Sequence, residues 1–232
     1  MRPLLVTVAI AAVAAGCSGE GDVRAPPDRV DRGPERPART SAAVPTRFHG
    51  RPLSVLLTRT RPAPLAAQCD DAAAAAGRPI VCPALLPEVP IVRDPNLHGG
   101  AAPYSRDGFY VISANNGENG RALHFIVGLG SAAWLDRHVF DDRFNTVRGR
   151  PRRLRDVTVD GETARVYRFF GGANAGHVGA VVDRADGTQA FASMHGRRYT
   201  DVAVLMAVDL ARQPASWTAE RPLPRPSSTR AG

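Results

Sequence analysis

Two histidines in the last third of the chain stand at positions from which they could act together. His177 begins the segment HVGAVVD, and His195 ends the segment QAFASMH. A hairpin whose three-residue loop ends at Gly187 places these histidines opposite each other, with Cβ atoms about 5 Å apart. Imidazoles at that distance can share a metal ion or a proton. A shift of one residue in the pairing separates them, so two hydrogen-bonded or solvated histidines are the alternative.

A glycine-rich turn has the outline of a dinucleotide-binding loop. Gly128-x-Gly130-x-x-Ala133 follows a strand-like segment and precedes a helix-like one. The preceding segment, however, reads as the second arm of an antiparallel hairpin, and no parallel strand with a terminal carboxylate follows. We interpret the glycines as a tight strand-to-helix turn and expect no cofactor. The sequence favours a protein without catalytic activity. The alternative is a metal-dependent or hydrolytic enzyme that uses His177 and His195.

Cys17 comes directly after a short apolar segment. Residues 4–15 are too few for a membrane-spanning helix, which needs about 20 residues, and they fit an export signal. The tetrapeptide AAGC, with Ala14 where leucine is more usual, resembles the lipobox of bacterial lipoproteins of the actinobacterial type. The resemblance implies that a signal peptide (residues 1–16) is removed and that Cys17 carries a diacylglycerol thioether. The protein is then held by lipid on the extracytoplasmic face of the cell membrane; a plain secretion signal is the alternative.

The remaining cysteines, Cys69 and Cys82, form an even pair in a chain expected to be exported. Their spacing is not that of a CxxC redox or zinc motif, and no third metal ligand is nearby in the sequence. In an oxidising compartment such a pair is expected to form a disulfide. Two buried free thiols are the alternative.

The chain is strongly basic, and all its cationic side chains are arginines, which with 22 acidic residues give a net charge of +8. Five of these arginines are clustered within eight residues: Arg148, Arg150, Arg152, Arg153 and Arg155. On a lipid-anchored protein they can contact anionic lipid or an anionic envelope polymer, or they form a solvated loop. Nucleic acid is not expected as a partner of an exported protein. The low aromatic content, 6%, argues against a stacking platform for bases or sugars.

Composition divides the chain into four parts. After the signal, residues 17–46 are rich in Pro, Arg, Asp and Gly and are expected to be a disordered linker. Residues 47–213 are expected to fold as one globular domain, and residues 214–232 are expected to be a disordered tail. The most direct functional expectation is a binding or scaffolding module of the envelope, without catalysis; a lipid carrier is a further alternative.

The domain is expected to be α+β. It begins with a strand in PLSVLLTR, followed by an alanine-rich helix that ends at Gly77. Three hairpins follow, with a short helix at SAAWLDRHVF and a terminal helix at TDVAVLMAVDLAR, which Thr200 is expected to cap. The last hairpin has apolar residues on both faces, which indicates an antiparallel sheet of about six or seven strands with helices on both faces. This order of elements resembles that of the PsbP-like exported lipoproteins.

Overall fold

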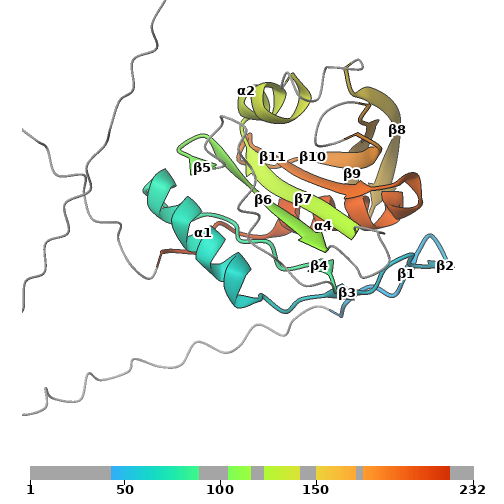
Figure 1. The fold of residues 1–232 in the computed structure, drawn as a ribbon, viewed down its shortest axis with the longest axis horizontal. Helices are drawn as coiled ribbons and strands as arrows, with labels where there is room; N and C mark the ends of the chain where they lie inside the picture. The colour runs from blue at the N-terminus through green and yellow to red at the C-terminus, as the bar shows by residue number, and fades with distance from the viewer. Residues whose placement is uncertain (1–42, 89–103, 116–122, 142–149, 171–174, 220–232) are drawn as a thin grey trace, which may run out of the picture. The chain divides into compact units, whose positions relative to one another are not determined.

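A seven-stranded antiparallel sheet forms the centre of the protein, with strand order β5-β6-β7-β11-β10-β9-β8. The computed structural model describes residues 43–88, 104–115, 123–141, 150–170 and 175–219 (Figure 1). The strands are β5 (Tyr104–Ser105), β6 (Gly108–Asn115), β7 (Leu123–Gly130), β8 (Arg152–Val159), β9 (Glu162–Arg168), β10 (His177–Asp183) and β11 (Gln189–His195). With its helices, this sheet makes an α+β domain, so the predicted fold class is confirmed.

Short turns set the register of the hairpins. Asp160 and Gly161, between β8 and β9, both have positive φ (48° and 89°), which is the backbone of a two-residue type I′ turn. Gly187, between β10 and β11, also has a positive φ of 80°. These turns fix the pairings of the two hairpins, and the pairing of β6 with β7 completes the three predicted hairpins.

Helices α1 (Ala63–Ala76) and α4 (Thr200–Arg212) cover one face of the sheet (Figure 1). The alanine-rich helix ends as expected at Gly77, which has a φ of 64° and donates its N–H to the carbonyls of Ala73 and Ala74. The four apolar residues predicted to line one side of α4 are all buried: Val202, Leu205, Met206 and Leu210. They pack with alternate residues of the strands, among them Ala192 and Met194.

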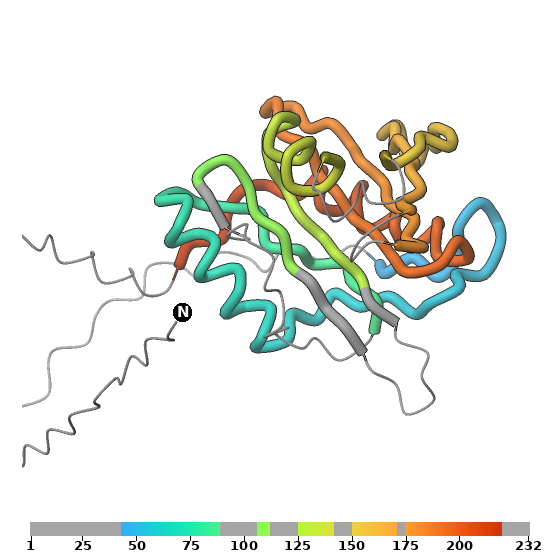
Figure 2. Tube along the Cα trace, turned by 45° about the horizontal axis from the view of Figure 1, so that its top comes forward, coloured from blue at the N-terminus to red at the C-terminus, as the bar shows by residue number. Residues whose placement is uncertain are grey.

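A second, smaller core lies on the opposite face of the sheet. Helix α2 (Ala132–Leu135) continues into η1, a π-helical turn (Asp136–Phe140). Figures 1 and 2 show this yellow-green segment on the side of the sheet away from α4. Trp134, Leu135 and Val139 pack there against strand residues that include Phe191. Side chains of β10 and β11 are therefore buried on both faces, which explains the nearly continuous apolar sequence of these strands.

The N-terminal part of the domain differs from the prediction. In place of one strand in PLSVLLTR, the chain forms two-residue strands: β1 (Arg47–Phe48) pairs with β2 (Arg51–Pro52), and β3 (Leu57–Thr58) pairs with β4 (Leu86–Pro87). Ser54, between β2 and β3, instead donates a 2.8 Å hydrogen bond to Asp201 at the start of α4. Thr200 is not the cap of α4 either, because it is already helical and donates to the carbonyl of Arg197.

The predicted end of the domain at residue 213 is also wrong. Trp217 pairs with Ile80 through two 2.9 Å backbone hydrogen bonds, and its indole N–H donates to Asp70 on α1 at 2.9 Å. Trp217, although it lies in a polar segment, therefore has a structural role, because it packs on the domain. Within the described ranges, no helix combines the length and apolarity needed to cross a bilayer.

Candidate functional site

The structure pairs His177 with His195 across β10 and β11, in the register that the sequence predicts. Their ring centroids are 5.3 Å apart in an edge-to-face arrangement. His177 is fully buried, and its Nδ1 lies 3.1 Å from the hydroxyl oxygen of the buried Ser193, whereas His195 is exposed. The described residues contain no group of three His, Cys, Asp or Glu side chains arranged to hold a metal ion. The pair is thus a buried imidazole beside an exposed one, and Ser193 has no solvent access for use as a nucleophile.

The glycines of the 128–133 turn make room for the protein's own side chains. A Cβ on Gly128 would lie 2.7 Å from the Phe109 carbonyl oxygen, and a Cβ on Gly130 would lie 2.7 Å from the Trp134 ring. The Ser131 hydroxyl oxygen then accepts a 3.1 Å hydrogen bond from the backbone N–H of Trp134 and caps the start of α2. The expected strand-to-helix turn is present, and close packing accounts for both glycines.

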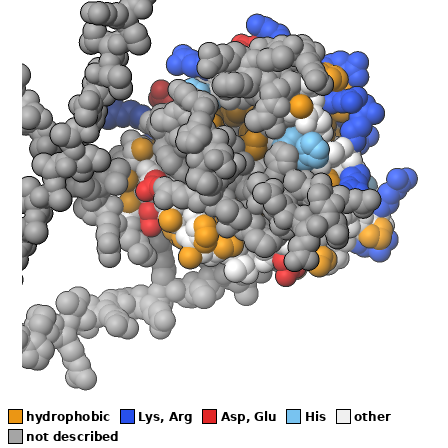
Figure 3. Space-filling view, viewed as in Figure 1, with side chains coloured by type: hydrophobic (Ala, Val, Ile, Leu, Met, Phe, Trp, Pro, Cys, Tyr) orange, Lys and Arg blue, Asp and Glu red, His pale blue; other side chains and the backbone are white. Residues whose placement is uncertain are grey.

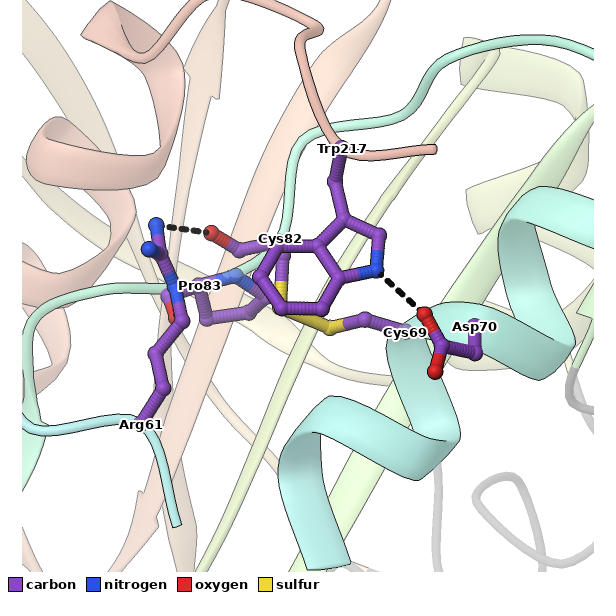
Figure 4. Close-up of a disulfide and its surroundings, with 6 residues drawn as sticks. All are labelled: Arg61, Cys69, Asp70, Cys82, Pro83 and Trp217. Carbon is purple, nitrogen blue, oxygen red and sulfur yellow. Dashed lines mark hydrogen bonds between the residues drawn. A yellow bond between two sulfur atoms is a disulfide. The ribbon is translucent and has the colours of Figure 1, made fainter. Parts of the chain in front are cut away.

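Cys69 and Cys82 form a disulfide, as predicted, with an S–S distance of 2.07 Å and a Cα–Cα distance of 5.7 Å. Both cysteines are buried. Figure 4 shows the Trp217 indole beside the bridge, with the Arg61 guanidinium 5.4 Å from the centre of the indole and donating to the Cys82 carbonyl. The disulfide therefore joins α1 to residue 82, and Trp217 of the C-terminal segment packs beside it. Cys17 lies outside the described residues.

The arginine cluster lies on and beside β8, at one edge of the sheet. Arg148 is outside the described residues, whereas the other four arginines are exposed. Arg153 is paired with Asp156 through contacts of 2.6 and 2.7 Å, and this hydrogen bonding raises the pKa of its guanidinium. Arg150 lies 3.4 Å from Asp141. No ion pair of Arg152 or Arg155 occurs within the described part of the chain, so both remain open to an external anion.

This edge of the sheet is accessible along the first five of the eight residues of β8. Residues 152–156 are all exposed, and the register shifts between Arg153 and Arg155, which leaves Leu154 as the extra residue of a β-bulge. Bulges and cationic side chains on an edge strand prevent unwanted pairing with other strands. In Figure 3, arginine side chains gather along the side of the molecule on which β8 and the β1–β2 pair lie in Figure 1.

A hollow of about 370 Å³ lies on the face of the sheet that α2 and η1 partly cover, and no pattern in the sequence marks it. Its lining combines charged, polar and aromatic residues: Ala132, Asp136, Phe140, Asp141, Arg150, Pro151, Arg165, Tyr167, Val181 and Gln189. Few aromatic residues occur in the sequence, but the structure gathers six of them in and around the second core: Tyr110, Trp134, Phe140, Tyr167, Phe169 and Phe191. Low aromatic content therefore gave no sign of this cluster, whose members come from three strands, two helical segments and the residue that follows β9.

One wall of this hollow is an ion-pair network. Arg165 donates to both oxygens of Asp183 at 2.5 and 2.8 Å, and Gln189 donates to the same carboxylate at 2.8 Å. The hydrogen bond from Arg165 is the main cause that lowers the pKa of Asp183 to about 2. Asp183 is therefore ionised under all physiological conditions, and the charge of Arg165 is already balanced.

Comparison of the chain with protein-family models, with curated proteins and with solved structures finds no match.

Proposed function

We propose that the protein is a lipid-anchored, extracytoplasmic module of the bacterial cell envelope that binds an anionic surface and does not catalyse a reaction. The observation that carries the binding function is the set of exposed arginines on the β8 edge. Arg152 and Arg155 extend from a strand whose first five residues are exposed. Each cationic residue close to an anionic membrane surface contributes roughly 1 kcal/mol to binding.

The anchored location has separate support. The AAGC tetrapeptide ending at Cys17 has the pattern of a lipidation site, and residues 17–46 have the composition of a flexible linker. The Cys69–Cys82 disulfide supports an exported protein, because disulfides persist mainly in oxidising compartments. A tether at Cys17 keeps the arginine edge near a membrane or wall polymer, which raises its effective concentration there.

Vesicle sedimentation tests the binding function. A Cys17→Ser chain, which carries no lipid, is expected to bind phosphatidylglycerol-containing vesicles and to bind phosphatidylcholine vesicles weakly. Replacing Arg152 and Arg155 by alanine is expected to weaken binding about 30-fold, because two contributions of roughly 1 kcal/mol are lost. Added salt is expected to weaken binding of the parent more than binding of the double variant.

The matched control replaces Arg197 and Arg198, two exposed arginines of η3 (Arg197–Tyr199), and removes the same total charge. This control is expected to retain most of the affinity. An equal loss of affinity in both double variants means that net charge alone drives binding. That result would contradict a specific role of the β8 edge in binding. Replacing the vesicles by purified anionic wall polymer distinguishes the two envelope surfaces.

A further inference from the structure

The hollow beneath α2 and η1 is separate from the anchor at Cys17, and Arg152 and Arg155 do not line it. Its volume of about 370 Å³ is within the range of small-molecule sites, about 300–1,000 Å³. We propose that this hollow binds a neutral polyhydroxylated molecule of the size of a mono- or disaccharide. The proposal stands on the lining residues alone and does not depend on the proposed envelope function.

The lining of the hollow contains two carboxylates and two guanidinium groups, so its formal charges sum to zero. Asp136 and Asp141, on and just after η1, face a lining that also contains Arg150 and Arg165. Arg150 lies 3.4 Å from Asp141. Arg165 is held by Asp183 through two hydrogen bonds. An anionic ligand would lie near Asp136 and Asp141, and a cationic ligand would lie near Arg150 and Arg165, so either charge meets groups of its own sign when water is displaced.

A neutral ligand with several hydroxyl groups suits the same lining. Hydroxyls both donate and accept, so they can donate to the carboxylates of Asp136 and Asp141 and accept from the Gln189 amide and the arginines. Hydrogen bonds to ionised partners are stronger than those between neutral groups. The lining thus offers both kinds of partner around one hollow, and a ligand that both donates and accepts can use all of them.

Aromatic rings supply the apolar part of the lining. Phe140 and Tyr167 meet edge to face with ring centroids 4.8 Å apart. The Phe140 ring also packs against the rings of Phe169 and Phe191, at centroid distances of 5.8 and 6.3 Å. Rings fixed in this way can bury the C–H surface of a sugar without losing side-chain entropy, because the core already orders them.

The π-helical turn η1 shapes the hollow. Its first and last residues, Asp136 and Phe140, both belong to the lining. The turn is closed by a hydrogen bond from the Asp141 N–H to the Asp136 carbonyl. Single π turns are rare and are frequently found at functional sites. Here the turn places one carboxylate and one aromatic ring of the same short segment beside the strands.

Three hexose derivatives that differ mainly in charge test the proposal on the full chain: glucose, glucosamine and glucuronate. Their binding to the protein is measured by ligand-observed NMR, together with the binding of other neutral pentoses, hexoses and disaccharides. We expect at least one neutral sugar to bind, and its charged counterparts to bind about ten-fold more weakly because each meets groups of its own sign. Tighter binding of glucuronate or glucosamine, or no binding of any neutral sugar at about 50 mM, overturns the proposal.

Variants locate the binding in the hollow. Asp136→Ala and Gln189→Leu are each expected to weaken sugar binding about ten-fold, because each removes a hydrogen-bonding partner of the ligand. Glu88→Ala removes an exposed carboxylate that does not line the hollow and is expected to leave binding unchanged. Thermal unfolding shows whether either lining variant is destabilised, and only a folded variant is used. If both folded variants bind the sugar as tightly as the parent, the hollow is not the site.

Discussion

Replacing both Cys69 and Cys82 by alanine is expected to lower the free energy of unfolding by about 3 kcal/mol. The disulfide closes a loop with a sequence separation of 13 residues, and its main effect is to restrict the unfolded chain. Both sulfur atoms are also buried beneath the contact of Trp217 with α1, so their loss removes packing from that region. Urea unfolding followed by circular dichroism measures the change.

Reductant supplies the control for this prediction. The parent protein in dithiothreitol is expected to unfold at a urea concentration close to that of the double alanine variant. The variant itself is expected to be insensitive to the reductant. Identical unfolding midpoints for the oxidised parent and the variant would show that the bridge contributes nothing to stability.

Phe191→Ala is expected to destabilise the domain by about 3–5 kcal/mol. Phe191 is fully buried in β11, which lies between β7 and β10 in the sheet. Its ring packs against Phe169 with a centroid distance of 6.0 Å. Truncation leaves a cavity in the smaller core, because the neighbouring large side chains are already packed and relax only partly into the space.

Phe48→Ala is the matched control for Phe191→Ala. Phe48 lies in the two-residue strand β1 and is only partly buried against the larger core. Its truncation is expected to cost less than about 1.5 kcal/mol. Chemical denaturation of both variants compares the sites, and similar losses would contradict the described difference in burial. Because Phe191 also supports Phe140, the first variant is further expected to weaken any ligand binding in the hollow.

Local signals in the sequence account for the correct predictions. Asp160-Gly161 and the loop ending at Gly187 have the residue types that positive φ values require, so the turns fixed the register of their strands. The opposition of His177 and His195 followed from counting outward from such a turn. The disulfide followed from the number of cysteines once export was inferred, because an even pair remained.

Features that depend on contacts between distant residues could not be predicted in this way. Ser54 bonds Asp201, and Trp217 bonds Asp70, each across 147 positions of the chain. No periodicity or composition marks such pairs, so the first strand and the end of the domain were both assigned incorrectly.

The hollow was missed for the same reason. Its lining extends from Ala132 to Gln189 and depends on a π-helical turn, and no sequence signal in DRHVF separates such a turn from an α-helical one. The surroundings of one arginine also differ between the sequence-based prediction and the fold. Arg150 and Arg155 were predicted as members of one basic cluster, but Arg150 also lines the hollow beside Asp141.

The intact mass of the chain recovered from bacterial membranes tests the central claim most directly. The mature protein is expected to begin at Cys17 and to carry a diacylglycerol group, and a Cys17→Ala chain is expected to leave the membrane fraction. A mature protein whose mass contains no diacylglycerol, or a Cys17→Ala chain that stays membrane-bound, would contradict the lipid anchor.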